Sequence, residues 1–135
     1  MGSVSAMGHL LAVEPRLHVQ DLALSVAFYR DVLGFRVTTQ FPDAAPVFAM
    51  LQRERVHLQL GGPAGRRTAA QASTCTLWFD VDDAMALHRD IAAQAPIEWG
   101  PEVYFYGRRE FAVRDPDGNL LVFSSLTDDP ATCRE

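Results

Sequence analysis

Apolar residues in the first half of the chain follow a helical spacing that is flanked by short strand-like runs. Four of them recur every three or four residues and form one helix face: Leu22, Val26, Tyr29 and Leu33. Asp21 stands where a helix N-cap accepts backbone N–H bonds, and Gly34 stands where a left-handed residue ends a helix. The runs on either side predict strands at residues 15–19, 35–40, 47–51 and 56–60. This half therefore predicts one βαβββ unit.

The second half predicts the same order of elements. Residues 74–81 alternate as a strand, Asp82 or Asp83 caps the following helix, and Pro96 should stop it. The apolar stripe of this helix consists of Ala84, Leu87, Ile91 and Ala95. Three further strands are predicted at residues 97–103, 109–114 and 120–125. The last two are joined by Asp115-Pro116-Asp117-Gly118-Asn119, a turn in which proline fixes φ and glycine or asparagine takes a positive φ.

The two halves also share short sequences. Val19-Gln20-Asp21 recurs as Val81-Asp82-Asp83, and Phe48-Ala49 recurs as Phe111-Ala112, about 62 to 63 residues later. The sequence therefore predicts an α+β domain of two tandem βαβββ modules. The predicted divisions are a leader at 1–12, a first module at 13–62, a linker at 63–72, a second module at 73–127 and a polar tail at 128–135.

Composition narrows the partners and the location. With 135 residues, 48% of them apolar, the chain is long enough for one domain with one core. Its formal net charge of −5 supplies no basic surface for nucleic acid or an anionic membrane, and it tolerates a cationic small molecule. The first residues show no signal peptide or membrane span, and Cys75 and Cys133 have no metal-binding or redox spacing. A reducing cytoplasm is the expected location.

Several motifs are similar to those of one superfamily. Val19-Gln20-Asp21-Leu22, Phe28-Tyr29 and Leu33-Gly34-Phe35 resemble its first-module signature, and residues 114–119 resemble its last hairpin. Over residues 14–125 the chain resembles the vicinal-oxygen-chelate superfamily of glyoxalase I, extradiol dioxygenases and bleomycin-resistance proteins. The run at 107–119 looks most like the bleomycin-resistance branch. The resemblance implies a curled mixed sheet with the helices outside, but fold motifs do not specify chemistry.

The resemblance also implies four ligand positions for a divalent metal ion, two in each module. They fall on Glu14, Gln59, Thr76 and Val122. Glu14 and Gln59 each offer an oxygen, but the Thr76 hydroxyl is a weak ligand and Val122 is none. We therefore expect no metal and no other cofactor here, with Glu14 as an edge residue and Gln59 as a polar cavity residue.

An off-pattern metal site is the alternative. Strand alternation places Arg16 and His18 on the face of Glu14, and His57 on the face of Gln59. Glu14, His18 and His57 then offer ligands for a divalent metal ion, although the charge of Arg16 opposes a cation. The other interpretation is that both histidines are neutral residues of a polar cavity. No catalytic residue is assigned, because no serine or cysteine occupies a strained strand-to-helix turn.

Aromatic side chains supply further candidates for ligand binding. Trp78 shares strand parity with Thr76, so it should face the cavity with Asp80 beside it, and the resemblance matches it to a tryptophan of the bleomycin-resistance pattern. A second group forms either an exposed lip or a cover for a sheet edge or dimer contact: Trp99, Tyr104, Phe105 and Tyr106. The predicted ligand-binding set is Trp78, Asp80, Phe41, Phe48, Trp99, Tyr104, Tyr106, His57, Gln59 and His18.

The resulting hypothesis is a non-catalytic protein, similar to bleomycin-resistance proteins, that sequesters a bulky, cationic and heteroaromatic antibiotic-like molecule. The alternative is a metal-dependent lyase, isomerase or dioxygenase of the same superfamily that uses the off-pattern site. The resemblance further implies a homodimer in which strands or loops of one copy complete the cavity of the other. A metabolite sensor or a protein-interaction subunit has no positive feature in the sequence.

Overall fold

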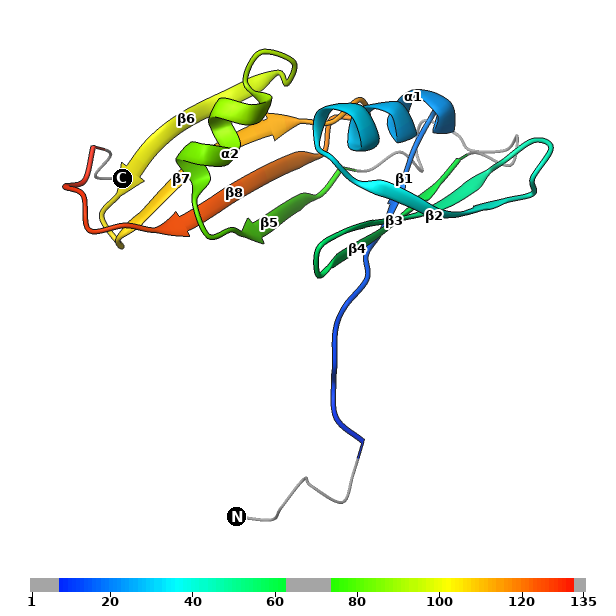
Figure 1. Ribbon diagram of the computed structural model, residues 1–135, viewed down its shortest axis with the longest axis horizontal. Helices are drawn as coiled ribbons and strands as arrows, with labels where there is room; N and C mark the ends of the chain where they lie inside the picture. Colours follow the sequence, from blue (N-terminus) through cyan, green and yellow to red (C-terminus); the bar gives the residue numbers. More distant parts are fainter. Residues whose placement is uncertain (1–7, 63–73, 133–135) are drawn as a thin grey trace.

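The computed structural model describes residues 8–62 and 74–132, and the predicted linker at 63–72 lies outside them. The described residues form two four-stranded mixed sheets (Figure 1). The first has the order β1 (Arg16–His18), β4 (Val56–Gly61), β3 (Phe48–Arg53) and β2 (Arg36–Phe41). The second has the order β5 (Thr76–Asp80), β8 (Leu120–Leu126), β7 (Arg108–Arg114) and β6 (Ile97–Tyr104). In each module the first and last strands pair in parallel, which confirms the predicted α+β fold of two βαβββ units.

An aspartate begins the helix of each module. In α1 (Leu22–Ala27) the Asp21 side chain accepts a hydrogen bond from the backbone N–H of Leu24 at 3.1 Å. In α2 (Ala84–Ile91) Asp83 accepts one from the backbone N–H of Ala86 at 3.0 Å. Both caps satisfy amides that the first helical turn leaves without a partner. The cap of α2 is therefore Asp83 and not Asp82.

The end of the first helix differs from the prediction. The spacing predicts one regular helix to Leu33, whereas α1 continues as a π-helical turn, η1 (Phe28–Val32). The backbone N–H of Leu33 reaches back five residues to the carbonyl of Phe28 at 3.3 Å. Gly34 then takes a φ of +76°, and the N–H of Phe35 donates to the carbonyl of Tyr29 at 2.8 Å. This closes the helix with Tyr29 and Leu33 both buried.

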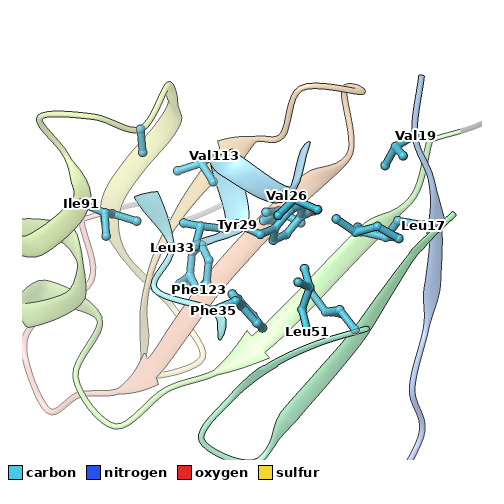
Figure 2. Packing of buried hydrophobic residues seen from close by; sticks show 14 of the residues in the cluster. Leu17, Val19, Val26, Tyr29, Leu33, Phe35, Leu51, Ile91, Val113 and Phe123 are labelled. Carbon is cyan, nitrogen blue, oxygen red and sulfur yellow. The ribbon is translucent and has the colours of Figure 1, made fainter. Parts of the chain in front are cut away.

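One apolar core joins the two modules. Each sheet turns one face toward the helices, and buried side chains of both sheets and both helices form a single cluster. Figure 1 places α1 where the two sheets meet and α2 over the second sheet. The side chains labelled in Figure 2 are Leu17, Val19, Val26, Tyr29, Leu33, Phe35, Leu51, Ile91, Val113 and Phe123. No helix in the described part of the chain is long and apolar enough to cross a membrane.

Two aspartates of the last hairpin bind the first helix across the module boundary. The hydroxyl of the fully buried Tyr29 donates to Asp115 at 2.7 Å. The hydroxyl of Ser25 donates to Asp117 at 3.1 Å, and the backbone N–H of Gln20 donates to the same carboxylate at 2.9 Å. Asp115 also accepts the backbone N–H groups of Asp117 and Asn119, which holds the hairpin in shape. The residues that form this turn therefore also orient one module against the other.

We predict that Tyr29→Phe lowers the free energy of unfolding by about 1 to 3 kcal/mol at neutral pH, because Asp115 loses a buried donor. Burial, and secondarily the charge of Asp115, raises the pKa of Tyr29 far above its usual value of about 10. A raised pKa in the folded state gives stability that is complete below about pH 10 and is lost as the pH rises further. The wild-type advantage over Tyr29→Phe should therefore shrink above about pH 10 in urea titrations.

The amino-acid composition of the chain simplifies the comparison of wild type and Tyr29→Phe at alkaline pH. None of its twelve basic residues is lysine, so no lysine titrates in the same range. Burial also raises the pKa of Tyr106, to about 12, and Tyr106 remains in both proteins. Arg30→Ala is the control, since it removes only an exposed contact with Asp31 and should cost less than about 1 kcal/mol. Equal stability of wild type and Tyr29→Phe at neutral pH would contradict the prediction.

Candidate functional site

The first sheet carries a polar group on the face opposite the core. Leu17, Leu58 and Leu60 point into the core, so their neighbours on β1 and β4 point to the open face. There the amide of Gln59 donates to Glu14 at 2.7 Å, and Arg16 donates to the Gln59 amide oxygen at 3.0 Å. These contacts hold the two predicted first-module ligand positions together by hydrogen bonds.

These residues do not fit a metal ion. The Gln59 oxygen, which is its only ligand atom, already accepts a bond from a guanidinium group. Arg16 would also place its positive charge beside the ion. In the second module, Thr76 lies on β5 and Val122 is a buried residue of β8 without a donor atom. The four superfamily positions therefore supply too few oxygen or nitrogen atoms for a coordination shell.

The off-pattern set is not assembled either. His57 Nδ1 lies 3.9 Å from a carboxylate oxygen of Glu14. However, residues 8–62 and 74–132 contain no group of three or more His, Cys, Asp or Glu side chains close enough to hold a metal ion. His18 instead lies at a shallow depression that Arg16 and Phe48 also line. The structure therefore does not bring Glu14, His18 and His57 together.

Phe48 lies beside Arg16 and His18 on this sheet, and Phe41 lies next to Phe48. The two phenylalanines pair across β3 and β2, and the guanidinium of Arg16 lies 4.6 Å from the centre of the Phe48 ring. Phe48 is half-buried, so it is not a core residue, and Phe41 is 66% exposed. Both rings are thus accessible aromatic surface on the first module.

The open face of the second sheet carries a chain of polar side chains that runs across three strands. Arg108 contacts Asp80 and donates to the Ser124 hydroxyl at 2.6 Å. Ser124 in turn donates to Glu110 at 2.8 Å, and the Tyr106 hydroxyl donates to the other Glu110 oxygen at 2.7 Å. Glu110 is only 1% exposed, so these two hydroxyls satisfy a buried carboxylate.

Aromatic rings lie beside this polar chain. Trp78 pairs with Val122 in the sheet and is 52% exposed. The rings of Tyr104 and Tyr106 stack with centroids 5.6 Å apart, and Trp99 meets Tyr104 edge to face at 6.1 Å. Burial and the bond to Glu110 raise the pKa of Tyr106, so its hydroxyl stays a donor at neutral pH.

Sequence reasoning missed Glu110, Arg108 and Ser124. Glu110 precedes the core residue Phe111, and Arg108 lies two positions before Glu110, so strand alternation places both charged side chains on the face opposite the core. Nothing in that pattern shows that Tyr106 and Ser124 bury the carboxylate. The one available signal was parity, because Glu110 and Ser124 are cross-strand partners on the face of Trp78 and Asp80.

The two open faces remain separate within one chain. No strand of the first sheet pairs with a strand of the second. Five members of the predicted ligand-binding set belong to strands of the first sheet: His18, His57, Gln59, Phe41 and Phe48. The remaining members of the predicted ligand-binding set belong to the second sheet or the turn after it: Trp78, Asp80, Trp99, Tyr104 and Tyr106.

A model of the Glyoxalase/Bleomycin resistance protein/Dioxygenase superfamily matches residues 6–123. The chain belongs to this superfamily. A bleomycin-binding protein from bleomycin-producing Streptomyces verticillus, solved with copper(II)-bleomycin, is 27% identical. The match covers 91% of this chain and 100% of that one, with a TM-score of 0.69. A comparison with curated proteins gives no match.

Two other superfamily structures share the fold at lower identity. A lactoylglutathione lyase from Agrobacterium tumefaciens is 23% identical, with a TM-score of 0.68 and coverage of 85% of this chain and 92% of that one. A glyoxalase/bleomycin resistance protein/dioxygenase from Nocardioides is 16% identical, with a TM-score of 0.68 and coverage of 98% and 93%. The superfamily fold is thus shared by binding proteins and enzymes, and the site residues must decide between them.

We predict that Gly100→Ala disturbs the aromatic group far more than Gly107→Ala. Both glycines have a left-handed φ, +85° and +81°, so both substitutions strain the backbone by about 1 to 2 kcal/mol. At Gly100 the new methyl would also collide with the carbonyl oxygen of Glu110 and lie 2.8 Å from the Cα of Phe111. At Gly107 the nearest atom is 3.8 Å away.

Gly100→Ala should therefore destabilise the protein by roughly 3 kcal/mol or more, because β6 must move away from β7. Urea unfolding measures the loss, and near-ultraviolet circular dichroism reports the displacement of Trp99. Gly107→Ala is the matched control for backbone strain alone. Equal losses for the two variants would show that the close approach at Gly100 is unimportant.

Proposed function

We propose that this superfamily member is a non-catalytic binding protein that sequesters a bulky, cationic and heteroaromatic small molecule. The carrying observation is the aromatic surface on the open face of the second sheet, where Trp78 lies beside Asp80 on the edge strand β5 and the stacked Tyr104 and Tyr106 rings lie at the opposite edge, by β6. A planar heteroaromatic ring can stack on such side chains, each contributing on the order of 1 kcal/mol. Asp80 places a carboxylate beside Trp78 that pairs with Arg108, yet its side chain is 82% exposed and open to a ligand.

The metal-dependent alternative has less support. It needs three or four ligand atoms, whereas Gln59 is bonded to Arg16 and Val122 has no donor. The likeness to a lactoylglutathione lyase, at 23% identity, concerns the fold alone. The bleomycin-binding protein, at 27% identity over its whole length, favours the binding function. Metal analysis of the purified protein separates the two, because one tightly held metal ion per chain would favour an enzyme.

We further propose that the protein acts as a homodimer. Residues 8–13 leave the first sheet as an extended arm, which Figure 1 shows running away from the body of the chain. Leu10, Leu11 and Val13 on this arm are 102%, 94% and 86% exposed. Burying such exposed apolar side chains against another surface is favourable, by about 25 cal/mol for each Å² buried. A second copy could supply that surface and bring an open face of its own beside those of the first.

We predict that copper(II)-bleomycin binds saturably and that Trp78→Ala weakens binding about tenfold or more, as the loss of a central aromatic contact commonly does. Isothermal calorimetry measures both affinities. Leu24→Ala is the matched control, because Leu24 is an exposed apolar residue on α1, away from the open face. Equal affinity of wild type and Trp78→Ala would remove the second sheet from the binding site. No saturable binding, together with turnover by metal-loaded protein, would contradict the proposed function.

The arm yields a separate prediction. Replacing Leu10, Leu11 and Val13 by serine should convert the dimer to a monomer, because the buried apolar area is lost. Sedimentation velocity measures the change. Substituting Leu24 and Leu126 by serine is the control, since both are exposed apolar residues outside the arm. A monomeric wild-type protein would contradict the homodimer.

A further inference from the structure

A cavity of about 440 Å³ lies between the two modules on the helix side, away from the open faces. The β3–β4 hairpin forms one wall, and the β5–α2 connection with α2 forms the other. Figure 1 shows this hairpin reaching toward the end of β5. The volume of the cavity falls within the range of small-molecule sites, and such sites are common at the boundary between two modules or domains. Of the predicted ligand-binding set, only Asp80 lines it. We call this cavity the inter-module cleft.

The floor of the inter-module cleft is apolar and comes from both modules. Leu33 and Phe35 follow the π-helical turn of the first module, and Phe123 belongs to β8 of the second. Figure 2 shows these three side chains next to one another. Phe79 and Leu87 continue the apolar surface and are half-buried. The cleft therefore offers continuous apolar contact area to a ligand body.

The rim of the inter-module cleft is acidic. The lining residues include five carboxylates and two guanidinium groups: Glu54, Asp80, Asp82, Asp83 and Asp90, with Arg53 and Arg55. Three of the carboxylates already have partners. Glu54 pairs with Arg53, Asp80 pairs with Arg108, and Asp83 caps α2.

Two rim carboxylates remain available. Asp82 and Asp90 have no hydrogen bond or ion pair with another described residue, and both are exposed. They stand at the beginning of α2 and near its end, on the side of the cleft where the Phe79 and Leu87 side chains lie. The carboxylates of Asp82 and Asp90 would both attract a positive charge held above this apolar floor.

We propose that the inter-module cleft binds a small amphipathic cation, with an aromatic or branched apolar body on the floor and an ammonium or guanidinium group at Asp82 and Asp90. This site goes beyond the proposed function: the two share Asp80, which pairs with Arg108, but no aromatic residue of the open face lines the cleft. The arm at residues 8–13 is the poorer occupant. Between His9 and Val13 it carries no arginine to match the acidic rim.

The cleft also borders the contact between the modules. The Phe35 ring on its floor lies 5.8 Å from the Tyr29 ring, whose hydroxyl binds Asp115. A ligand in the cleft touches both modules at once and binds only their folded arrangement. Binding should therefore raise the thermal midpoint of unfolding by mass action.

The test uses 1-naphthylmethylammonium as probe, with neutral 1-naphthylmethanol and anionic 1-naphthoate as matched compounds. Amide NMR shifts of Val56, Ala86 and Leu87 report the cleft, and the indole N–H shifts of Trp78 and Trp99 report the open face. We expect saturable shifts at the cleft amides with the cation, weaker binding of the neutral compound and none of the anion. Added salt should weaken the binding of the cation.

A charge variant gives the decisive comparison. Asp82→Asn with Asp90→Asn should weaken binding of the cation by about three- to tenfold. Asp43→Asn with Asp128→Asn makes the same charge change at exposed aspartates outside the cleft and should alter affinity less than about twofold. Circular dichroism and thermal unfolding confirm that all variants are folded.

Any of these results with the probe compounds would overturn the proposal: shifts confined to the tryptophan indoles, equal binding of the anion, or equal affinity of the two double variants. Cleft amide shifts caused by the serine substitutions at Leu10, Leu11 and Val13 would assign the cleft to the arm of a second copy, and would also overturn it. Trp78→Ala keeps the two proposals distinguishable. That variant should lose bleomycin affinity while binding the naphthyl cation as the wild type does.

Discussion

The hydrogen bond between the Tyr29 hydroxyl and Asp115 is the interaction on which the arrangement of the two modules depends. Both groups are buried, so neither can exchange its partner for water without a cost of about 1 to 3 kcal/mol. Asp117 adds contacts to Ser25 and Gln20 from the same hairpin. The open face of each sheet and the inter-module cleft are consequences of this fixed arrangement, because each is formed by what the shared core leaves uncovered.

Local rules explain why so much of the fold could be predicted from the sequence. Asp21 and Gly34 act within one helical turn of their own positions, and the 115–119 turn forms its bonds within five residues. The π-helical turn could not be predicted, because residues at 22, 26, 29 and 33 fit a regular helix equally well. Nor could the role of Asp117, whose partner Gln20 is 97 residues away. Such contacts depend on how the modules pack.

The candidate site was predictable to the same extent. The resemblance named Glu14 and Gln59 as ligand positions, and in the structure these two side chains are hydrogen-bonded to each other. Strand parity placed Trp78 and Asp80 on one face, and both are exposed residues of β5. It could not show that Glu110 is buried by its neighbours, since a charged residue in an alternating strand normally points to solvent. The inter-module cleft was also beyond reach, because its two walls come from segments that no sequence pattern relates. The sequence could not predict contacts between side chains of different strands or different modules.

On the first sheet, the residues at the superfamily's ligand positions are hydrogen-bonded to one another and to Arg16. In place of an ion, a guanidinium group from Arg16 satisfies Gln59, and the Gln59 amide satisfies Glu14. A metal ion would have to displace Arg16 and then accept that charge as a neighbour, which is unfavourable on both counts. Binding a flat cationic molecule needs neither step. It requires exposed rings, which Trp78 provides at one edge of the second sheet and Tyr106 at the other, where the buried Glu110 holds the Tyr106 hydroxyl in place.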